Sequence, residues 1–375
     1  MPWVFWGSLA VLAYIYAGYP LLAWAAARLF GRAPAAAETT PVVSLLIPAY
    51  NEERYLAQKL ANVMALDYPR DRLEIVVASD GSTDRTNGIA RQFADRGVAL
   101  IALPENVGKT AMLNRVVPQL RGAVVVFSDV SGTLEHDAVR RLVRSFADAR
   151  VGCVSGLYRL AGAGDLRSEG EGLYWRYETF IKQQESRLHS ILGGHGAFYA
   201  IRASLFRPLT AGTINDDYLI PMQIVAQGYR AVYEPTAVAW EQELVSMEGE
   251  FARRRRIAMG NCQQVVALRG LLNPLRGWIA WCFFSHKLLR TLAPIFMLAL
   301  LASTAWAPAP WRAPALLLQA AFYGSAAVGY WLQRRGRSSR WLSAPLYFCF
   351  GNLAMLAGLA TFCCRRRPLV WERAR

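Results

Sequence analysis

The sequence predicts an α/β domain with a mainly parallel sheet, flanked at both ends by helices that span a membrane. Short β-branched runs alternate with amphipathic stretches between residues 42 and 245, as in parallel sheets that helices cover on both faces. An uninterrupted apolar run over residues 3–30 is long enough to cross a bilayer, and three more apolar segments follow residue 275. The chain is 54% hydrophobic yet has a net charge of +15, which is typical of membrane proteins with arginine-rich cytoplasmic segments.

The first element is a membrane anchor, which we assign to residues 1–32. Its apolar run contains no charge before Arg28, and no small-residue cleavage site ends it, so we expect an anchor instead of a cleaved signal peptide. Arg28 and Arg32 follow the run and predict that the next domain lies in the cytoplasm, at an inner or plasma membrane. The stretch "GRAPAAAETTP", residues 31–41, is typical of a linker.

The α/β domain is predicted over residues 42–245. Its first strands are "VVSLLIP", "LEIVVASD", "VALIALP" and "AVVVFSD", with helices expected near 52–66, 84–97 and 108–120. The carboxyl ends of these strands lead into "AYNEE", "SDGSTD", "PENVGK" and "SDVSG". Ligands of parallel sheets bind outside the carboxyl ends of the strands, so we expect the functional site at this rim.

The C-terminal part begins with a basic amphipathic stretch at residues 246–275 that is suited to the membrane interface, followed by a membrane region over 276–375. Its apolar segments are 276–307, 313–332 and 342–364. The first of them carries His286, Lys287 and Arg290, which we expect to snorkel or to face protein. Basic runs at 334–340 and 363–368 would lie on opposite sides of the membrane if every segment crossed it. Either the last segment is re-entrant or interfacial, or the C-terminus violates the positive-inside rule.

Several polar motifs carry candidate chemistry. Asp80 ends a strand, where an acidic residue can accept hydrogen bonds from the ribose or base of a nucleotide. A tight turn followed by a helix cap explains "DGSTD" equally well. Lys109 begins a helix after Gly108, where backbone N–H groups and an ammonium can meet a phosphate. Asp129 ends another strand and is a candidate ligand for a divalent metal.

Asp216 and Asp217 stand side by side at a predicted helix start. Either residue alone satisfies the need for an N-terminal cap. Adjacent carboxylates can raise the pKa of one member, as a general base requires. The pair is therefore a candidate for catalysis.

Taken in chain order, these motifs resemble those of family 2 glycosyltransferases with the GT-A fold. The matching stretches are "SLLIPAYNEE", "EIVVASDGSTD", "NVGKTAMLN", "VVFSDVSG", "LGGHGAFYAIR", "NDDYLIPMQIVAQGYRAVYEP" and "RRRRIAMGN", which cover about residues 42–261. The pattern is similar to the membrane-anchored branch of cellulose, hyaluronan and poly-N-acetylglucosamine synthases, with which the apolar segments agree.

The resemblance implies a cytoplasmic GT-A (Rossmann-like) domain and a role for each matched residue. Asp217 would be the catalytic base, with Asp216 in place of the usual glutamate, and Asp129 would hold Mg²⁺ or Mn²⁺ against the donor diphosphate. Gly194, His195 and Gly196 would lie near the acceptor. The implied donor-binding residues are Pro48, Tyr50, Glu52, Asp80, Lys109, Ser128, Asp129, Arg254 and Arg256.

Two departures from the family pattern bear on function. Ser131 stands where the family often has a second metal-binding aspartate, which weakens the metal site without removing it. In the Gln-x-x-Arg-Trp element, Arg253 takes the Gln position, Arg256 matches the Arg and Ile257 replaces the Trp. That Trp is associated with holding an acceptor chain, so long-chain processivity is in doubt.

The sequence therefore predicts an integral-membrane, inverting hexosyltransferase that uses a nucleotide sugar, with UDP as the expected nucleotide, and a divalent metal. The acceptor would be a polysaccharide or a lipid-linked glycan of the exopolysaccharide or cell envelope, with membrane lipids as further partners. The alternative is a non-catalytic scaffold or export subunit that keeps the fold. Nucleic acid is not expected as a partner, because the basic clusters flank apolar segments.

Overall fold

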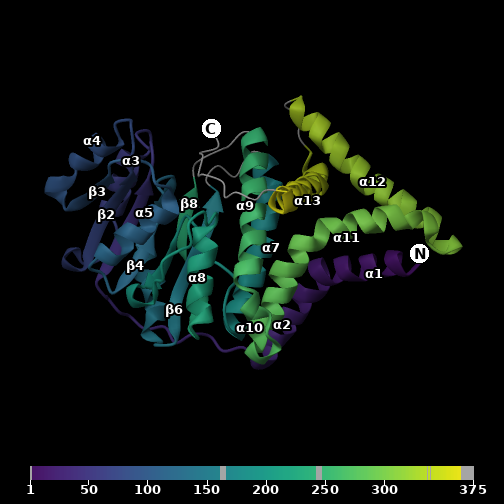
Figure 1. The fold of residues 1–375 in the computed structure, drawn as a ribbon, viewed down its shortest axis with the longest axis horizontal. Coiled ribbons are helices and arrows are strands. Elements are labelled where there is room, and N and C mark those ends of the chain that lie inside the picture. Colours follow the sequence, from purple (N-terminus) through teal and green to yellow (C-terminus); the bar gives the residue numbers. More distant parts are fainter. Residues whose placement is uncertain (1, 161–165, 242–246, 336, 338, 365–375) are drawn as a thin grey trace.

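The computed structural model describes residues 2–160, 166–241, 247–335, 337 and 339–364. An α/β half and a helical half lie at opposite ends of the long axis (Figure 1). The α/β half holds an eight-stranded sheet. The predicted class, an α/β domain flanked by long apolar helices, is confirmed.

The sheet is mixed and has the strand order β3-β2-β1-β4-β7-β6-β8-β5. Its strands are β1 (Val43–Ala49), β2 (Leu73–Asp80), β3 (Val98–Leu103), β4 (Val124–Phe127), β5 (Gly132–Leu134), β6 (Val151–Leu160), β7 (Tyr199–Arg202) and β8 (Arg230–Glu241). The four strands predicted from the apolar runs pair in parallel. In the other half, β7 runs antiparallel to β4 and β6, and β5 runs antiparallel to β8. Strands β6 and β8 pair in parallel, so the predicted mainly parallel sheet is confirmed, with the antiparallel pairings confined to its second half.

Helices cover both faces of the sheet, and this explains why β1 lacks polar alternation. Leu46 packs on one side against a core that includes Met112. Leu45 and Ile47 pack on the other side, where Leu60 closes a second core. Each such fully buried side chain contributes about 1.5–3 kcal/mol through removal of apolar surface from water.

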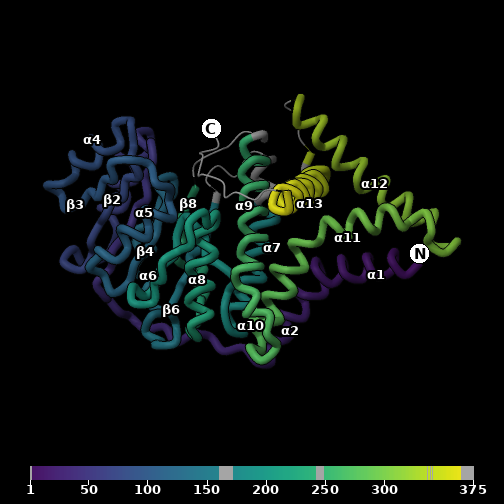
Figure 2. Tube along the Cα trace, in the orientation of Figure 1, coloured from purple at the N-terminus to yellow at the C-terminus, as the bar shows by residue number. Residues whose placement is uncertain are grey.

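The helices of the α/β half connect and cover the strands. They are α3 (Leu56–Met64), α4 (Thr86–Arg91), α5 (Lys109–Val116), α6 (Ala138–Val143), α7 (Leu166–Leu188) and α8 (Asp216–Ala226). The long helices α7 and α9 (Met247–Ala267) stand between the sheet and the helical half (Figure 2).

Four helical segments are long and apolar enough to cross a membrane, namely Pro2–Phe30, Trp278–Trp306, Ala309–Arg334 and Trp341–Cys364. They comprise α1 (Pro2–Ala13), α2 (Tyr19–Phe30), α10 (Trp278–Cys282), α11 (Arg290–Ser303), α12 (Ala309–Arg334) and α13 (Arg340–Cys364). The first two each contain a π-helical stretch, Tyr14–Gly18 and Phe283–Leu289. The two stretches contact each other through Tyr14, whose hydroxyl lies 2.7 Å from Ser285 Oγ and accepts from Trp281 Nε1 at 2.9 Å. Such stretches bend helices and often occur at functional sites.

Helix α13 is oriented differently from the other apolar helices. In Figure 1 it is seen nearly end-on, whereas α1 and α11 run together across the view. It packs on α9 and α12. The basic run at 363–368 lies largely outside the described residues, as does the expected boundary at 245–246, so the four-part division of the chain stays a proposal.

Candidate functional site

A cavity of about 1500 Å³ opens at the rim where the sequence placed the site. It begins at the carboxyl ends of β1 and β4 and continues along α9 to α12 and α13. The predicted site residues that line it are Pro48, Tyr50, Glu52, Lys109, Asp129, Gly194, His195, Gly196, Asp216, Asp217, Arg254 and Arg256. The fold thus brings together residues from six separate sequence motifs.

Three carboxylates and one ammonium form the polar centre of the cavity. Lys109 Nζ bridges Asp129 Oδ1 at 3.3 Å and Asp216 Oδ2 at 3.2 Å. A Cβ atom placed on Gly196 would lie 3.1 Å from Asp217 Oδ2 and 3.5 Å from Asp129 Oδ2. The absence of a side chain at Gly196 therefore leaves room between two carboxylates.

The start of α8 sets the protonation of Asp217. Burial raises the pKa of this carboxyl group to about 6, and the charges of Asp216 and Asp129 act in the same direction while Lys109 opposes them. For Lys109, burial lowers the pKa but the nearby carboxylates outweigh it, so the net pKa is raised and the ammonium stays charged. An aspartate that titrates near neutrality is suited to accept a proton during a reaction.

Asp80 and Ser128 lie behind the cavity wall, which differs from the expected donor contact. Asp80 is 1% exposed, and its two oxygens accept from the backbone N–H groups of Val107 (2.9 Å) and Gly108 (2.8 Å). Ser128 is fully buried and accepts from Lys59 Nζ at 2.7 Å. Both side chains fix loops that carry site residues. A direct contact of Asp80 with a nucleotide stays a prediction.

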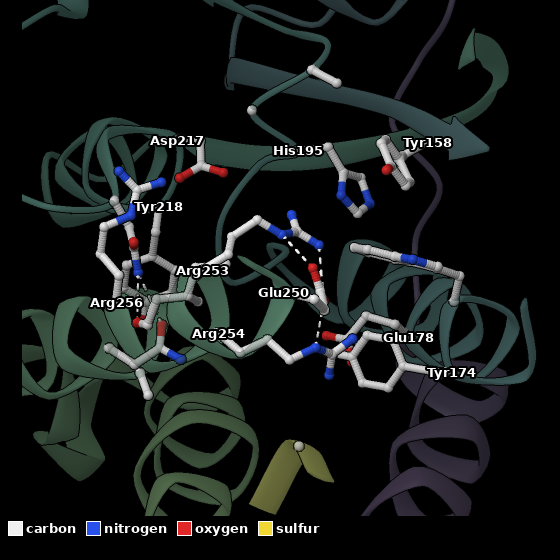
Figure 3. A pocket seen from close by; sticks show the side chains of 18 of the residues that line it. Tyr158, Tyr174, Glu178, His195, Asp217, Tyr218, Glu250, Arg253, Arg254 and Arg256 are labelled. Carbon is white, nitrogen blue, oxygen red and sulfur yellow. Dashed lines mark hydrogen bonds and ion pairs between the residues drawn. The ribbon is translucent and has the colours of Figure 1, made fainter. Parts of the chain in front are cut away.

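Arg254, expected as part of a phosphate clamp, is held elsewhere. Its Nε donates to Glu250 Oε1 at 2.5 Å, and its guanidinium lies 4.2 Å above the Tyr347 ring and donates to the Tyr347 hydroxyl. Arg253 also donates to Glu250, at 2.8 Å (Figure 3). These contacts direct Arg254 to α13, and its donor-binding role stays a prediction. The sequence could not show the contact with α13, since Tyr347 lies 93 residues away.

Arg256 lines the cavity, and its role in a phosphate clamp stays a prediction. Burial lowers the pKa of Arg256, and the charges of Asp216, Asp217 and Asp129 oppose that shift. Figure 3 shows it on the same side of the cavity as Asp217. Arg255, one position away, is exposed. The two neighbouring arginines of α9 therefore point in different directions, as expected from helical periodicity.

His195 forms part of an aromatic wall opposite Arg256 (Figure 3). Its ring centre lies 5.2 Å from that of Trp175, and its Nε2 lies 3.2 Å from Lys182 Nζ. Burial and the Lys182 charge hold the pKa of His195 well below its ordinary value, so the ring is neutral. An apolar, aromatic wall of this kind can pack against a sugar ring or a lipid. The acceptor role of His195 stays a prediction.

Sequence reasoning missed a charged cluster in the same cavity, formed by Glu178, Lys182, Lys287 and Arg290. Arg290 donates to Glu178 Oε2 at 2.8 Å, across the junction of α7 and α11. The sequence signal for this cluster was the presence of Lys287 and Arg290 within the first C-terminal apolar segment. Both side chains face protein, as expected for ionisable groups within an apolar segment.

The residues present fit a divalent metal, with Asp129 as its protein ligand. The Asp129 side chain is 39% exposed into the cavity, so a cation can reach it. Among the described residues, no group of three or more His, Cys, Asp or Glu side chains could hold a metal by itself. Mg²⁺ and Mn²⁺ do not require one, because donor phosphates can supply the remaining ligands.

Several known proteins are similar to this chain in sequence and in fold. The glycosyl transferase family 2 model matches residues 44–210. The probable glycosyltransferase YdaM of Bacillus subtilis (strain 168) is 32% identical over 248 residues, which are 62% of this chain and 57% of that protein. The beta-monoglucosyldiacylglycerol synthase of Synechocystis sp. (strain ATCC 27184 / PCC 6803 / Kazusa) is 25% identical over 89% of this chain and 74% of its own length.

A solved structure extends the similarity to almost the whole fold. The mannosyltransferase PcManGT from Pyrobaculum calidifontis, in complex with GDP-Man and Mn²⁺, superposes with a TM-score of 0.71 at 25% identity. The match covers 96% of this chain and 99% of that one. The predicted GT-A fold is thereby confirmed.

Proposed function

We propose that this chain, whose residues 44–210 match the glycosyl transferase family 2 model, transfers a hexose from a nucleotide sugar to a lipid-borne acceptor at the membrane surface. The observation that carries the proposal is the shape of the cavity. It connects Asp217 with apolar side chains of α13, such as Leu346 and Phe350, in the helical half. A lipid could extend along that wall while its polar end meets the carboxylates.

In the proposed reaction, Asp217 accepts the proton of an acceptor hydroxyl as the hydroxyl oxygen attacks the anomeric carbon. The bond from that carbon to the diphosphate oxygen breaks on the opposite face, and the nucleoside diphosphate leaves with the electron pair. One displacement inverts the anomeric configuration, and its transition state resembles an oxocarbenium ion. The raised pKa of Asp217, about 6, keeps the base ionised but basic at neutral pH.

Cationic groups would stabilise the leaving diphosphate. Arg256 and Lys109 both line the cavity and interact electrostatically with the carboxylate centre, and a guanidinium meets two phosphate oxygens at once. A divalent metal held by Asp129 would neutralise further charge on the diphosphate. We do not include Arg254 in the clamp, because Glu250 and Tyr347 engage it.

A UDP-sugar remains the first donor to test, and GDP-mannose is the second because PcManGT was solved with GDP-Man. A lipid-borne acceptor is supported by the cyanobacterial glucosyldiacylglycerol synthase, which matches 89% of this chain. Ile257 stands where the resembled synthases have a tryptophan for the acceptor chain, which argues against a long polysaccharide. We further propose that the α/β half is cytoplasmic, since Arg28 and Arg32 follow the first apolar helix.

The test is a donor screen with purified protein in lipid nanodiscs, with and without Mg²⁺ or Mn²⁺, followed by extraction with organic solvent. We expect one labelled sugar to enter the organic phase in a metal-dependent manner. A ladder of water-soluble oligomers would establish a polysaccharide synthase instead. Failure to consume any nucleotide sugar would favour the alternative, a non-catalytic scaffold that keeps the fold.

A further inference from the structure

Two lysines in the cavity wall have no carboxylate partner within ion-pair distance among the described residues. Lys182 comes from α7, and its Nζ lies 3.2 Å from His195 Nε2. Lys287 comes from the π-helical stretch that precedes α11, and its Nζ lies 4.6 Å from the centre of the Tyr218 ring. Two segments that are distant in sequence therefore bring ammonium groups to one cavity.

The nearby carboxylates are engaged by other groups. Glu178 contacts His286 Nε2 at 3.0 Å through one oxygen and Arg290 at 2.8 Å through the other. Glu185 Oε1 contacts His286 Nδ1 at 2.7 Å and accepts from the Tyr19 hydroxyl at 2.6 Å. Its second oxygen is buried without a hydrogen-bond partner and forms no ion pair with either lysine. The cluster thus holds a surplus of positive charge.

The charges of Glu178, Glu185 and Asp217 act on Lys182 from a distance, but none of these carboxylates forms an ion pair with it. A buried ammonium without a contacting anion is costly, so its retention calls for a ligand. Lys182 is only 5% exposed, and burial lowers its pKa to about 8, so it still carries its charge at pH 7. Its neighbour His195 is neutral and cannot offset that charge. An anion in the cavity would compensate both lysines.

The two lysines lie close to the proposed catalytic base, which indicates where an anion bound to them would lie within a substrate. Tyr218, beneath Lys287, follows Asp217 in α8, and His195, beside Lys182, precedes Gly196 next to the same carboxylate. The cavity continues from here to the apolar side chains of α13. An anion held by the lysines would lie between the proposed base and the path for a lipid chain.

We propose that Lys182 and Lys287 bind the phosphate group of the lipid acceptor. The inference rests on the proposed function and names its acceptor class, a lipid that carries a phosphate next to the hydroxyl to be glycosylated. Bound in this way, the headgroup presents its hydroxyl to Asp217. A neutral glycolipid precursor would leave both ammonium groups uncompensated.

Binding of short lipids to the full chain in dodecyl maltoside tests the proposal. The probes are farnesyl phosphate, dioctanoyl phosphatidate, farnesol and inorganic phosphate. The two lipid phosphates carry no free alcohol hydroxyl, so they report binding of a lipid phosphate at the lysines without sugar transfer. We expect one of the two lipid phosphates to bind at least about tenfold more tightly than farnesol and inorganic phosphate, since a charge-assisted contact is worth about this factor. Lys182→Gln and Lys287→Gln should each remove most of that preference, and Lys287→Arg should keep it. Arg276→Gln, which removes an exposed charge that does not line the cavity, is the matched control.

The outcomes separate the possibilities. Preference for farnesyl phosphate indicates an isoprenoid acceptor, and preference for phosphatidate indicates a glycerolipid; either supports the proposal. Equal binding of farnesyl phosphate, phosphatidate and farnesol by the wild-type chain overturns it, even if the lysine variants fail to fold. So does inorganic phosphate binding as tightly as the lipids, or lysine variants that match the control. Binding of UDP and GDP, measured in parallel, reports on the donor site. Failure of the proposed function is therefore distinguishable from failure of the lipid-phosphate proposal alone.

Discussion

The titration of Asp217 gives the sharpest prediction of the proposed mechanism. The base acts only when ionised, and burial together with Asp216 raises its pKa to about 6. Activity should therefore be full above that pH and fall as the pH drops through it. The sign is set by the raised pKa, since an unperturbed aspartate would remain ionised throughout this window.

The magnitude follows from the ionised fraction. With a pKa of about 6, roughly one tenth of the enzyme is active at pH 5 and nearly all of it at pH 7.5, so turnover drops about tenfold. With the ordinary value of 3.8, the loss over the same interval would be less than about 10%. Asp216→Asn removes a charge that raises the pKa of Asp217, so the acid limb should move to lower pH.

The assay is the pH profile of nucleoside diphosphate release at saturating donor, quantified by chromatography. Samples held at pH 5 and returned to pH 7.5 must recover full activity, which separates titration from unfolding. A loss below twofold at pH 5 would refute the assignment of Asp217 as the titrating base. An acid limb that stays in place in Asp216→Asn would refute the electrostatic reasoning.

Further perturbations test other parts of the site. Arg256→Ala should lower kcat/KM for the donor about 10- to 100-fold, as expected for loss of a charge-assisted hydrogen bond. Arg255→Ala, at the exposed neighbouring position, should leave kcat/KM unchanged. Equal effects of the two substitutions would reject the phosphate clamp. Gly196→Ala should reduce turnover by at least about tenfold with unchanged thermal stability, because its Cβ would lie 3.1 Å from Asp217 Oδ2. Glu250→Gln should lower the melting temperature in detergent, since this carboxylate joins two arginines of α9. Removal of metal with EDTA should abolish turnover, and Mg²⁺ or Mn²⁺ should restore it; activity in EDTA would exclude the metal.

The sequence was most informative where the physics is local. Strands buried on both faces must be apolar throughout, so β1 and β2 could be located from composition alone. Because parallel strands share a carboxyl edge, the strand pattern by itself predicts that Lys109 and Asp129 lie at the same rim of the sheet. The lysine ammonium indeed lies 3.3 Å from that carboxylate.

The sequence was least informative where a partner lies far along the chain. Asp80 belongs to the rim by motif, but the backbone of Val107 and Gly108 occupies its oxygens. The second half of the sheet depends on pairings across α7 and α8, which no short pattern encodes. Lys182 and Lys287 meet only through packing of α7 on the helical half, and the charge within an apolar segment was the single hint.

Release of nucleoside diphosphate by the wild-type chain and by Asp217→Asn, side by side in the same lipid, tests the central claim most directly. The variant keeps the size of the side chain and loses the proposed base. We expect metal-dependent release by the wild type and a loss of at least about 100-fold in the variant, as is typical for removal of a general base. Equal release by both proteins, or none by the wild type with any nucleotide sugar, would contradict the assignment of this cavity as a glycosyltransferase active site.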